Sequence, residues 1–113
     1  MPYLQLHTSK QLSPAEKREL CGEIGKLMPL LPGKARDNTT MCLVDGCYME
    51  LGDAEPALNL EVRLYKPSPS ESKRAFAEQI SRLLEERLGV RQDRMSINIV
   101  EHASWTSGGV YRE

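Results

Sequence analysis

The sequence predicts an α+β domain built from two β-α-β units, in which four strands form one mixed sheet and two helices cover one face of it. Three observations predict this fold. Identical residues recur 56 positions apart, two segments show the alternation of strands, and two others show the apolar stripe of amphipathic helices. A chain of 113 residues is long enough for one domain with a modest core.

The internal repeat is visible in pairs of identical residues at this spacing. The pairs are Lys17 with Lys73, Arg18 with Arg74, Ile24 with Ile80, Leu27 with Leu83, Gly33 with Gly89, and Asp37 with Asp93. We therefore expect a single domain over residues 1–113, with pseudo-repeats at about 2–45 and 58–101.

Each copy is expected to begin with a strand, at Tyr3–Thr8 or Leu58–Tyr65, and to continue through Ser-Pro turn residues into a helix. The helix stripes are Leu20, Ile24, Leu27, Met28 and Leu31 in the first copy and Phe76, Ile80, Leu83, Leu84 and Leu88 in the second. Gly33 and Gly89 mark the helix ends, and second strands are expected at about 39–44 and 95–100. Residues 106–111 are expected to form a turn followed by a short strand or arm.

One face of the predicted sheet lacks a cover within the chain. A β-α-β unit is normally parallel with a right-handed crossover, so both helices are expected on the same face. In Leu58–Tyr65, apolar and polar residues alternate, and in 95–100 Ser96 and Asn98 point the same way. The polar face is expected either to be solvated or to line a subunit interface.

Charge and hydropathy argue against two classes of partner. The formal net charge of -1 gives no clustered basic surface for nucleic acid or for an anionic membrane. No apolar run approaches the roughly 20 residues of a membrane-spanning helix, and no basic region precedes a long apolar core. We therefore expect a cytoplasmic protein, with secretion by a route without a signal peptide left open.

The three cysteines are expected to be reduced thiols. Their odd number and wide spacing do not form a disulfide framework. Cys42 and Cys47 could be placed around zinc with His7 or His102, but their spacing is not that of a zinc knuckle and the histidines are distant in sequence. We expect small, partly buried side chains here, with no metal and no cofactor.

Several short stretches together suggest a known family. They are Pro2 at the start, Gly33-Lys34 after the first helix, and Glu86-Arg87-Leu88 followed by Asp93-Arg94 and Ile97-Asn98. With the duplicated plan, they make the chain resemble the macrophage migration inhibitory factor and D-dopachrome tautomerase family, of the tautomerase superfamily with an N-terminal proline. The resemblance spans nearly the whole chain and is most readable from about 55 to 101. It implies a homotrimer of β-α-β-β-α-β subunits with active sites between neighbours, and keto-enol tautomerisation of small α-keto acids of the phenylpyruvate type.

The resemblance also implies roles for four residues. Removal of Met1 would free the secondary amine of Pro2, which would then transfer the proton. Lys34 would lie near the substrate carboxylate, and Asn98 would come from the adjacent subunit as a hydrogen-bonding residue. Tyr65 lies where the family places an apolar wall residue.

Ser96 is the main departure of this chain from human-type members of the family. Ser96 stands where they have a tyrosine, and a serine cannot stack on an aryl ring and is a much weaker acid. Arg63 shares a predicted strand face with Tyr65; the wider superfamily includes enzymes whose arginines bind carboxylates and activate water, although a salt-bridged sheet residue is the simpler interpretation. The paired cysteines of those members are also missing at 57–60, so a thiol-disulfide oxidoreductase is not expected.

A proline amine needs a lowered pKa to act as a base. α-Amino groups titrate at about 7.7–8.0, and burial and a nearby cation such as Lys34 would both disfavour the charged form. Given the resemblance, tautomerase activity is the main functional prediction. The alternatives are a related proline-dependent hydratase, dehalogenase or decarboxylase, and a trimeric binding or signalling module with weak catalysis, which Ser96 favours.

Overall fold

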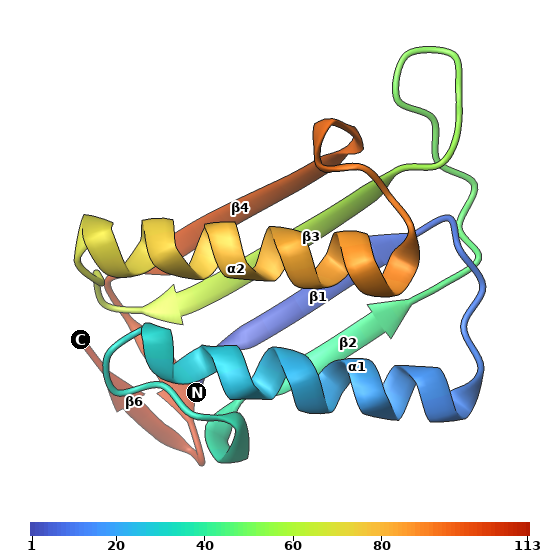
Figure 1. Cartoon of the computed structure of the whole chain (residues 1–113). Coiled ribbons are helices and arrows are strands. Elements are labelled where there is room, and N and C mark those ends of the chain that lie inside the picture. Colours follow the sequence, from blue (N-terminus) through green and yellow to red (C-terminus); the bar gives the residue numbers. More distant parts are fainter.

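In the computed structural model, which describes residues 1–113, two helices cover one face of a four-stranded sheet (Figure 1). The sheet strands are β1 (Tyr3–Thr8), β2 (Thr40–Val44), β3 (Leu58–Tyr65) and β4 (Met95–His102). The helices are α1 (Pro14–Leu27) and α2 (Ser70–Leu88), with 3-10 turns at Met28–Leu30, Arg36–Asn38 and Gln92–Arg94. A separate hairpin of β5 (Trp105–Ser107) and β6 (Val110–Arg112) ends the chain. Neither helix is both long and apolar enough to span a membrane.

The sheet topology confirms the predicted duplication. The strand order is β2-β1-β3-β4, with β1 parallel to β2, β3 parallel to β4, and the central pair β1 and β3 antiparallel. Leu6 lies opposite Leu60 in that central pair. Each β-α-β unit thus contributes two parallel strands and one helix, and the sheet as a whole is mixed.

Local sequence explains where the two helices begin and end. Ser13 caps α1, since its hydroxyl accepts a hydrogen bond from the Glu16 N–H at 3.1 Å, while the Glu16 carboxylate accepts one from the Ser13 N–H at 2.9 Å. Pro14 occupies the first turn, where its missing N–H costs nothing. α2 ends at Gly89, whose φ of 66° lies in the left-handed region that favours glycine.

The core lies between the helices and the even-numbered positions of the central strands. Its members are Leu4, Leu6, Leu12, Leu20, Ile24, Met28, Leu31, Leu58, Leu60, Val62, Leu64, Phe76, Ile80, Leu84, Leu88 and Val90. Burying one such side chain contributes about 1.5–3 kcal/mol, so this layer provides most of the favourable free energy of folding. The odd-numbered positions of β1 and β3 point to the opposite face, which no helix of the chain covers.

An acidic residue at the end of each parallel strand fastens the segment that leads into the helix. The Asp45 carboxylate accepts a hydrogen bond from the Leu12 N–H at 2.8 Å and pairs with Lys17 at 2.9 Å. Glu101, at the corresponding position of the second copy, accepts a hydrogen bond from the Ser68 N–H at 2.6 Å and pairs with Lys73 at 2.9 Å. The repeat therefore extends to a pair of equivalent polar contacts.

These contacts predict acid sensitivity. The backbone hydrogen bond from Leu12 and the contact with Lys17 lower the pKa of Asp45, and Lys73 and the Ser68 N–H lower the pKa of Glu101. A carboxyl whose pKa is lower in the folded state stabilises the fold above its unfolded pKa, and that contribution is lost as the pH falls through the folded value. At pH 7, we expect the double variant Asp45→Asn/Glu101→Gln to have a lower midpoint temperature of thermal unfolding than the wild type.

The difference between the two midpoints should shrink steadily as the pH is lowered from about 5 to 2. Asp53→Asn is the matched control, because Asp53 is exposed and forms no ion pair. A gap between wild type and double variant that stays constant over this pH range would contradict the assignment.

Candidate functional site

Pro2 lies buried at the start of β1, at the end of the sheet where β3 finishes. Its carbonyl accepts a hydrogen bond from the Thr40 N–H at 3.0 Å, which fixes the beginning of β1 against β2. Because β1 and β3 are antiparallel, Tyr3 lies opposite Arg63, so Pro2 lies close to the last residues of β3. The pairing thus brings the first and second copies of the repeat together at Pro2.

Lys34 reaches the same end of the sheet from the helix side. It follows Gly33, whose φ of 76° turns the chain after α1, and its N–H donates to the Leu31 carbonyl at 3.0 Å. The half-buried side chain extends toward β3, where Nζ donates to the Tyr65 carbonyl at 3.4 Å. Lys34 and Tyr65 therefore lie together, at the end of the sheet that holds Pro2.

The environment of the chain start disfavours a charged amine. Desolvation lowers the pKa of the Met1 amino group first, and the positive charges of Lys34 and Arg112 lower it further. Figure 1 shows that the N-terminus and the hairpin bearing Arg112 lie at the same end of the sheet. An amine here is shifted toward its neutral, proton-accepting form. The sequence does not predict that Arg112 lies near the N-terminus, because this proximity depends on how the terminal hairpin folds back.

The uncovered face of the sheet carries Arg63, Ser96 and Asn98. Arg63 forms an ion pair with Glu61, with 3.0 Å between Nη2 and Oε1. Ser96 and Asn98 are exposed on β4 and point the same way, as the sequence predicts. Arg63 thus already has one carboxylate partner on its own strand.

Asn98 lies away from the Pro2 end of its own chain. Its partner in the strand register is Glu61, and its Nδ2 donates to Asn59 Oδ1 at 3.3 Å and to the Leu60 carbonyl at 3.4 Å. Glu61 is four residues from Tyr65, a separation of about 13 Å along a strand. Ser96 is two residues further away. One chain therefore brings Pro2, Lys34 and Tyr65 together but leaves Asn98 and Ser96 apart from them.

A hollow of about 450 Å³ opens on the uncovered face beside the start of β1. Its wall consists of Tyr3, Arg63, His102, Trp105 and Thr106. These residues come from separate segments of the sequence. The turn between β4 and β5 brings the ring of Trp105 against the ring of His102, with their centroids 5.4 Å apart. No three of the chain's acidic, histidine and cysteine side chains gather in a way that could hold a metal ion.

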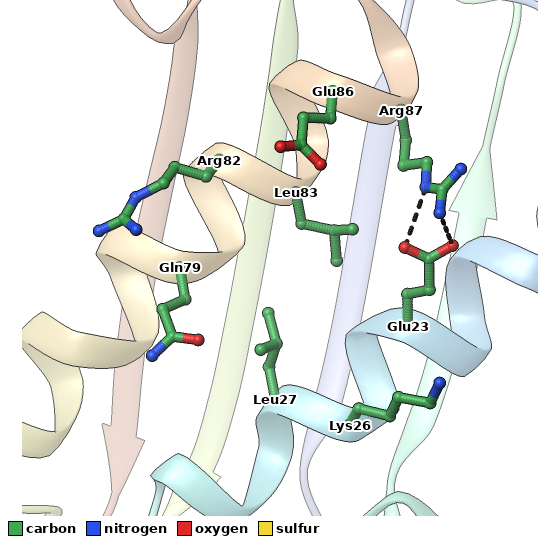
Figure 2. Close-up of a pocket in the computed structure, with 8 residues that line it drawn as sticks. All are labelled: Glu23, Lys26, Leu27, Gln79, Arg82, Leu83, Glu86 and Arg87. Carbon is green, nitrogen blue, oxygen red and sulfur yellow. Dashed lines mark hydrogen bonds and ion pairs between the residues drawn. The ribbon is translucent and has the colours of Figure 1, made fainter.

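A groove also runs between α1 and α2 on the other side of the molecule (Figure 2). Leu27 and Leu83, which correspond in the repeat, face each other across it, and Arg87 of α2 pairs with Glu23 of α1. Its charged residues are of both signs, and none of the predicted site residues lies in it. The Pro2 end of the sheet is the better candidate for chemistry.

Comparisons with solved structures find the same architecture. A scan of protein-family models and a search of curated proteins find no match. Leishmania major MIF2 superimposes with a TM-score of 0.90 at 17% identity, covering 99% of this chain and 97% of that one. The macrophage migration inhibitory factor-like protein from Entamoeba histolytica gives 0.84 at 15% identity, covering 98% of both chains. Pt0534, in a structure inactivated by 2-oxo-3-pentynoate, gives 0.81 at 17% identity, covering 96% of this chain and 94% of that one.

Likeness at such low identity speaks for the fold alone, and it agrees with the duplicated β-α-β topology. The chain has the fold of macrophage migration inhibitory factor.

Proposed function

We propose that this chain catalyses the keto-enol tautomerisation of small α-keto or enol acids of the phenylpyruvate type, with the amine of Pro2, freed by removal of Met1, as the general base. The observation that carries the proposal is the chain start. There Pro2 is buried at the end of the sheet that Lys34 reaches, and desolvation and the charges of Lys34 and Arg112 lower the pKa of the Met1 amine, one residue before it. The α-keto acid that inactivates the structurally similar Pt0534 supports the substrate class.

Met1 removal is essential to this chemistry. While Met1 is attached, the Pro2 nitrogen belongs to an amide and has no available lone pair. Once free, it is a secondary amine that sits one residue deeper than the Met1 amine, at a buried position. Desolvation and the charge of Lys34 act there in the same direction, toward the neutral base.

In the proposed reaction, the Lys34 ammonium pairs with the substrate carboxylate. The Pro2 nitrogen takes the enol O–H proton and returns it to the adjacent carbon as the carbonyl forms, or moves it in the reverse direction. A proton changes place and no atom is oxidised or reduced. Positioned proton transfer of this kind contributes about 10²–10⁴ in rate.

We further propose that the active unit is a homotrimer in which Asn98 comes from the neighbouring subunit. The polar sheet face without a cover and the distance of Asn98 from its own Pro2 support this assembly. Tyr65 would then form a wall of the pocket, and the Asn98 amide would hydrogen-bond the enolate oxygen, since Ser96 supplies no aromatic acid.

Ser96 favours one second candidate, a trimeric binding or signalling module with weak catalysis. The missing tyrosine removes both an acid and an aryl-stacking surface from the expected pocket. Whether the Pro2 amine is free and reactive distinguishes the two functions.

Covalent labelling tests the proposed base directly. In 2-oxo-3-pentynoate the alkyne is conjugated to the ketone, so the Pro2 nitrogen should bond to C4, and the ammonium proton lost from nitrogen should end on C3. We expect mass spectrometry to show one adduct per chain, located on the N-terminal peptide beginning at Pro2. Lys34→Met should slow labelling about tenfold, because the reagent carboxylate loses its charged partner.

The control reagent is 2-oxopentanoate, which lacks the alkyne and should leave no adduct. Retention of Met1 on the native protein, or an adduct located on Cys21, Cys42 or Cys47 instead of Pro2, would rule out the proposed base.

A further inference from the structure

A glycine near the end of α1 leaves space for a side chain from a later segment. Gly25 is buried within the helix, where glycine is a poor residue because its backbone loses more freedom than that of alanine. A methyl group on Gly25 would lie 2.6 Å from Arg36 Cδ and 2.9 Å from Arg36 Cβ, whereas carbon atoms in contact are about 3.5–4.0 Å apart. Only a residue without a side chain therefore allows Arg36 to lie against α1 at this position.

The guanidinium of Arg36 is also bound to α1. Its Nη1 donates a hydrogen bond to the Cys21 carbonyl at 2.7 Å. Cys21 and Gly25 are four residues apart, so they lie on the same face of the helix. The side chain of Arg36 thus contacts α1 twice, with its stem on Gly25 and its head group on Cys21.

The segment that carries Arg36 reaches the candidate site at two points. Residues 33–39 lead into β2 (Figure 1). Two residues before Arg36, Lys34 Nζ donates to the Tyr65 carbonyl at 3.4 Å. Directly after the segment, the Thr40 N–H donates to the Pro2 carbonyl at 3.0 Å. Arg36 lies between these two contacts, where it can fix the position of Lys34 relative to Pro2.

The other side-chain hydrogen bonds of this segment are internal. The Ala35 N–H donates to Asn38 Oδ1 at 3.2 Å, and the Thr39 hydroxyl donates to the Ala35 carbonyl at 2.5 Å. These bonds hold the shape of the turn, but they do not fix the turn relative to α1. The contacts of Arg36 with Gly25 and Cys21 do so.

We propose that Arg36, seated on Gly25, is a positioning residue that holds Lys34 in place and thereby sets the affinity for the substrate carboxylate. The effect on affinity rests on the proposed tautomerase function, whereas the hold on Lys34 does not. Arg36 acts through Lys34, because a cation whose backbone is already fixed loses less conformational freedom when it binds an anion.

Two alanine variants of α1 test the positioning role without changing any charge. Gly25→Ala and Gly22→Ala add the same methyl group to the same helix, but no atom outside the helix lies within 4 Å of a methyl group on Gly22. We expect Gly25→Ala to raise KM for phenylpyruvate about fivefold with kcat within about twofold, as for a weakened contact made equally in the ground and transition states. Gly22→Ala should leave both constants unchanged and raise the midpoint temperature of thermal unfolding.

The charge of the substrate distinguishes an effect on Lys34 from a general loss of structure. Methyl phenylpyruvate has the same enol and no carboxylate, so its kcat/KM should change by less than about twofold in Arg36→Ala and in Gly25→Ala. Arg36→Ala should raise KM for phenylpyruvate as Gly25→Ala does. It should have no further effect in a chain that carries Lys34→Met, because Arg36 acts through that lysine.

Hydrogen exchange measures the hold on Lys34 without any catalysis. We expect the amides of residues 33–39 to exchange several-fold faster in Arg36→Ala and Gly25→Ala than in the wild type and Gly22→Ala. The amides of α2 should exchange equally in all four proteins. If exchange is faster in this way but Lys34→Met leaves KM unchanged, Arg36 still positions Lys34, and the proposed role of Lys34 in the tautomerase is wrong.

Unchanged exchange at 33–39 in Arg36→Ala and Gly25→Ala would refute the positioning role, whatever the reaction rates. A raised KM in Arg36→Ala but not in Gly25→Ala would also refute it, because the charge of Arg36 and not its place on Gly25 would then be responsible. An equal loss of kcat/KM on phenylpyruvate and on its methyl ester would show a general structural defect and exclude an effect through Lys34.

Discussion

Replacing Pro2 with glycine should lower kcat/KM for phenylpyruvate tautomerisation by at least about 10²-fold, within the range of about 10²–10⁴ for a positioned proton-transfer group. Glycine keeps an N-terminal amine but replaces the rigid ring with a flexible residue. The nitrogen then loses the position that the buried Pro2 ring gives it, at the end of the sheet where Lys34 contacts Tyr65. The enol-keto assay should be run on wild type and variant after mass spectrometry has shown both to lack Met1.

Pro14→Ala is the matched control for this experiment. Pro14 is an exposed proline in the first turn of α1, remote from the candidate site, and its replacement should leave the rate within about twofold. Equal rates for wild type and Pro2→Gly would refute the proline mechanism and favour the binding module. Circular dichroism of the three proteins separates a chemical effect from loss of the fold.

Much of the fold was accessible from the sequence because strand and helix periods are local. The alternation in Tyr3–Thr8 and Leu58–Tyr65 predicted both strands with the bounds that the structure has, and Gly89 ends α2 as expected. The prediction that Leu27 and Leu83 belong to the apolar stripes that cover the sheet was less accurate. Both are only half-buried, because they line the groove between the helices instead of facing the sheet.

The candidate site was predicted only in part, because its remaining contacts depend on tertiary packing. Lys34 Nζ donates to the Tyr65 carbonyl at 3.4 Å, and the role of both residues in a substrate pocket stays a prediction. Arg112 beside the chain start, and Trp105 against His102, follow from a terminal hairpin of two strands where the sequence predicted a turn and one strand or arm. No periodic pattern encodes such a fold-back over eight residues.

Co-expression of two impaired chains should restore activity if the site lies between subunits. A Pro2→Gly chain keeps Asn98, and an Asn98→Ala chain keeps Pro2; the second change alone should cost about tenfold or more, as expected for a lost hydrogen bond to a developing charge. In a randomly mixed, closed ring of equal amounts, about a quarter of the interfaces pair an intact Pro2 with an intact Asn98. We therefore expect about a quarter of the wild-type rate, well above the mean of the two parents.

A second pair of variants controls for the position of each residue. Pro2 and Lys34 belong to the same chain and lie at the same end of its sheet. A chain carrying Pro2→Gly and a chain carrying Lys34→Met should therefore fail to complement each other in any mixture. This pair, like the Pro2→Gly and Asn98→Ala pair, combines two impaired chains, so only the location of the residues differs. Complementation by the Asn98 pair alone identifies the subunit boundary that the site crosses. A rate equal to the parental mean for both pairs, or a monomer mass by light scattering, would instead place the whole site within one chain and contradict the trimeric arrangement.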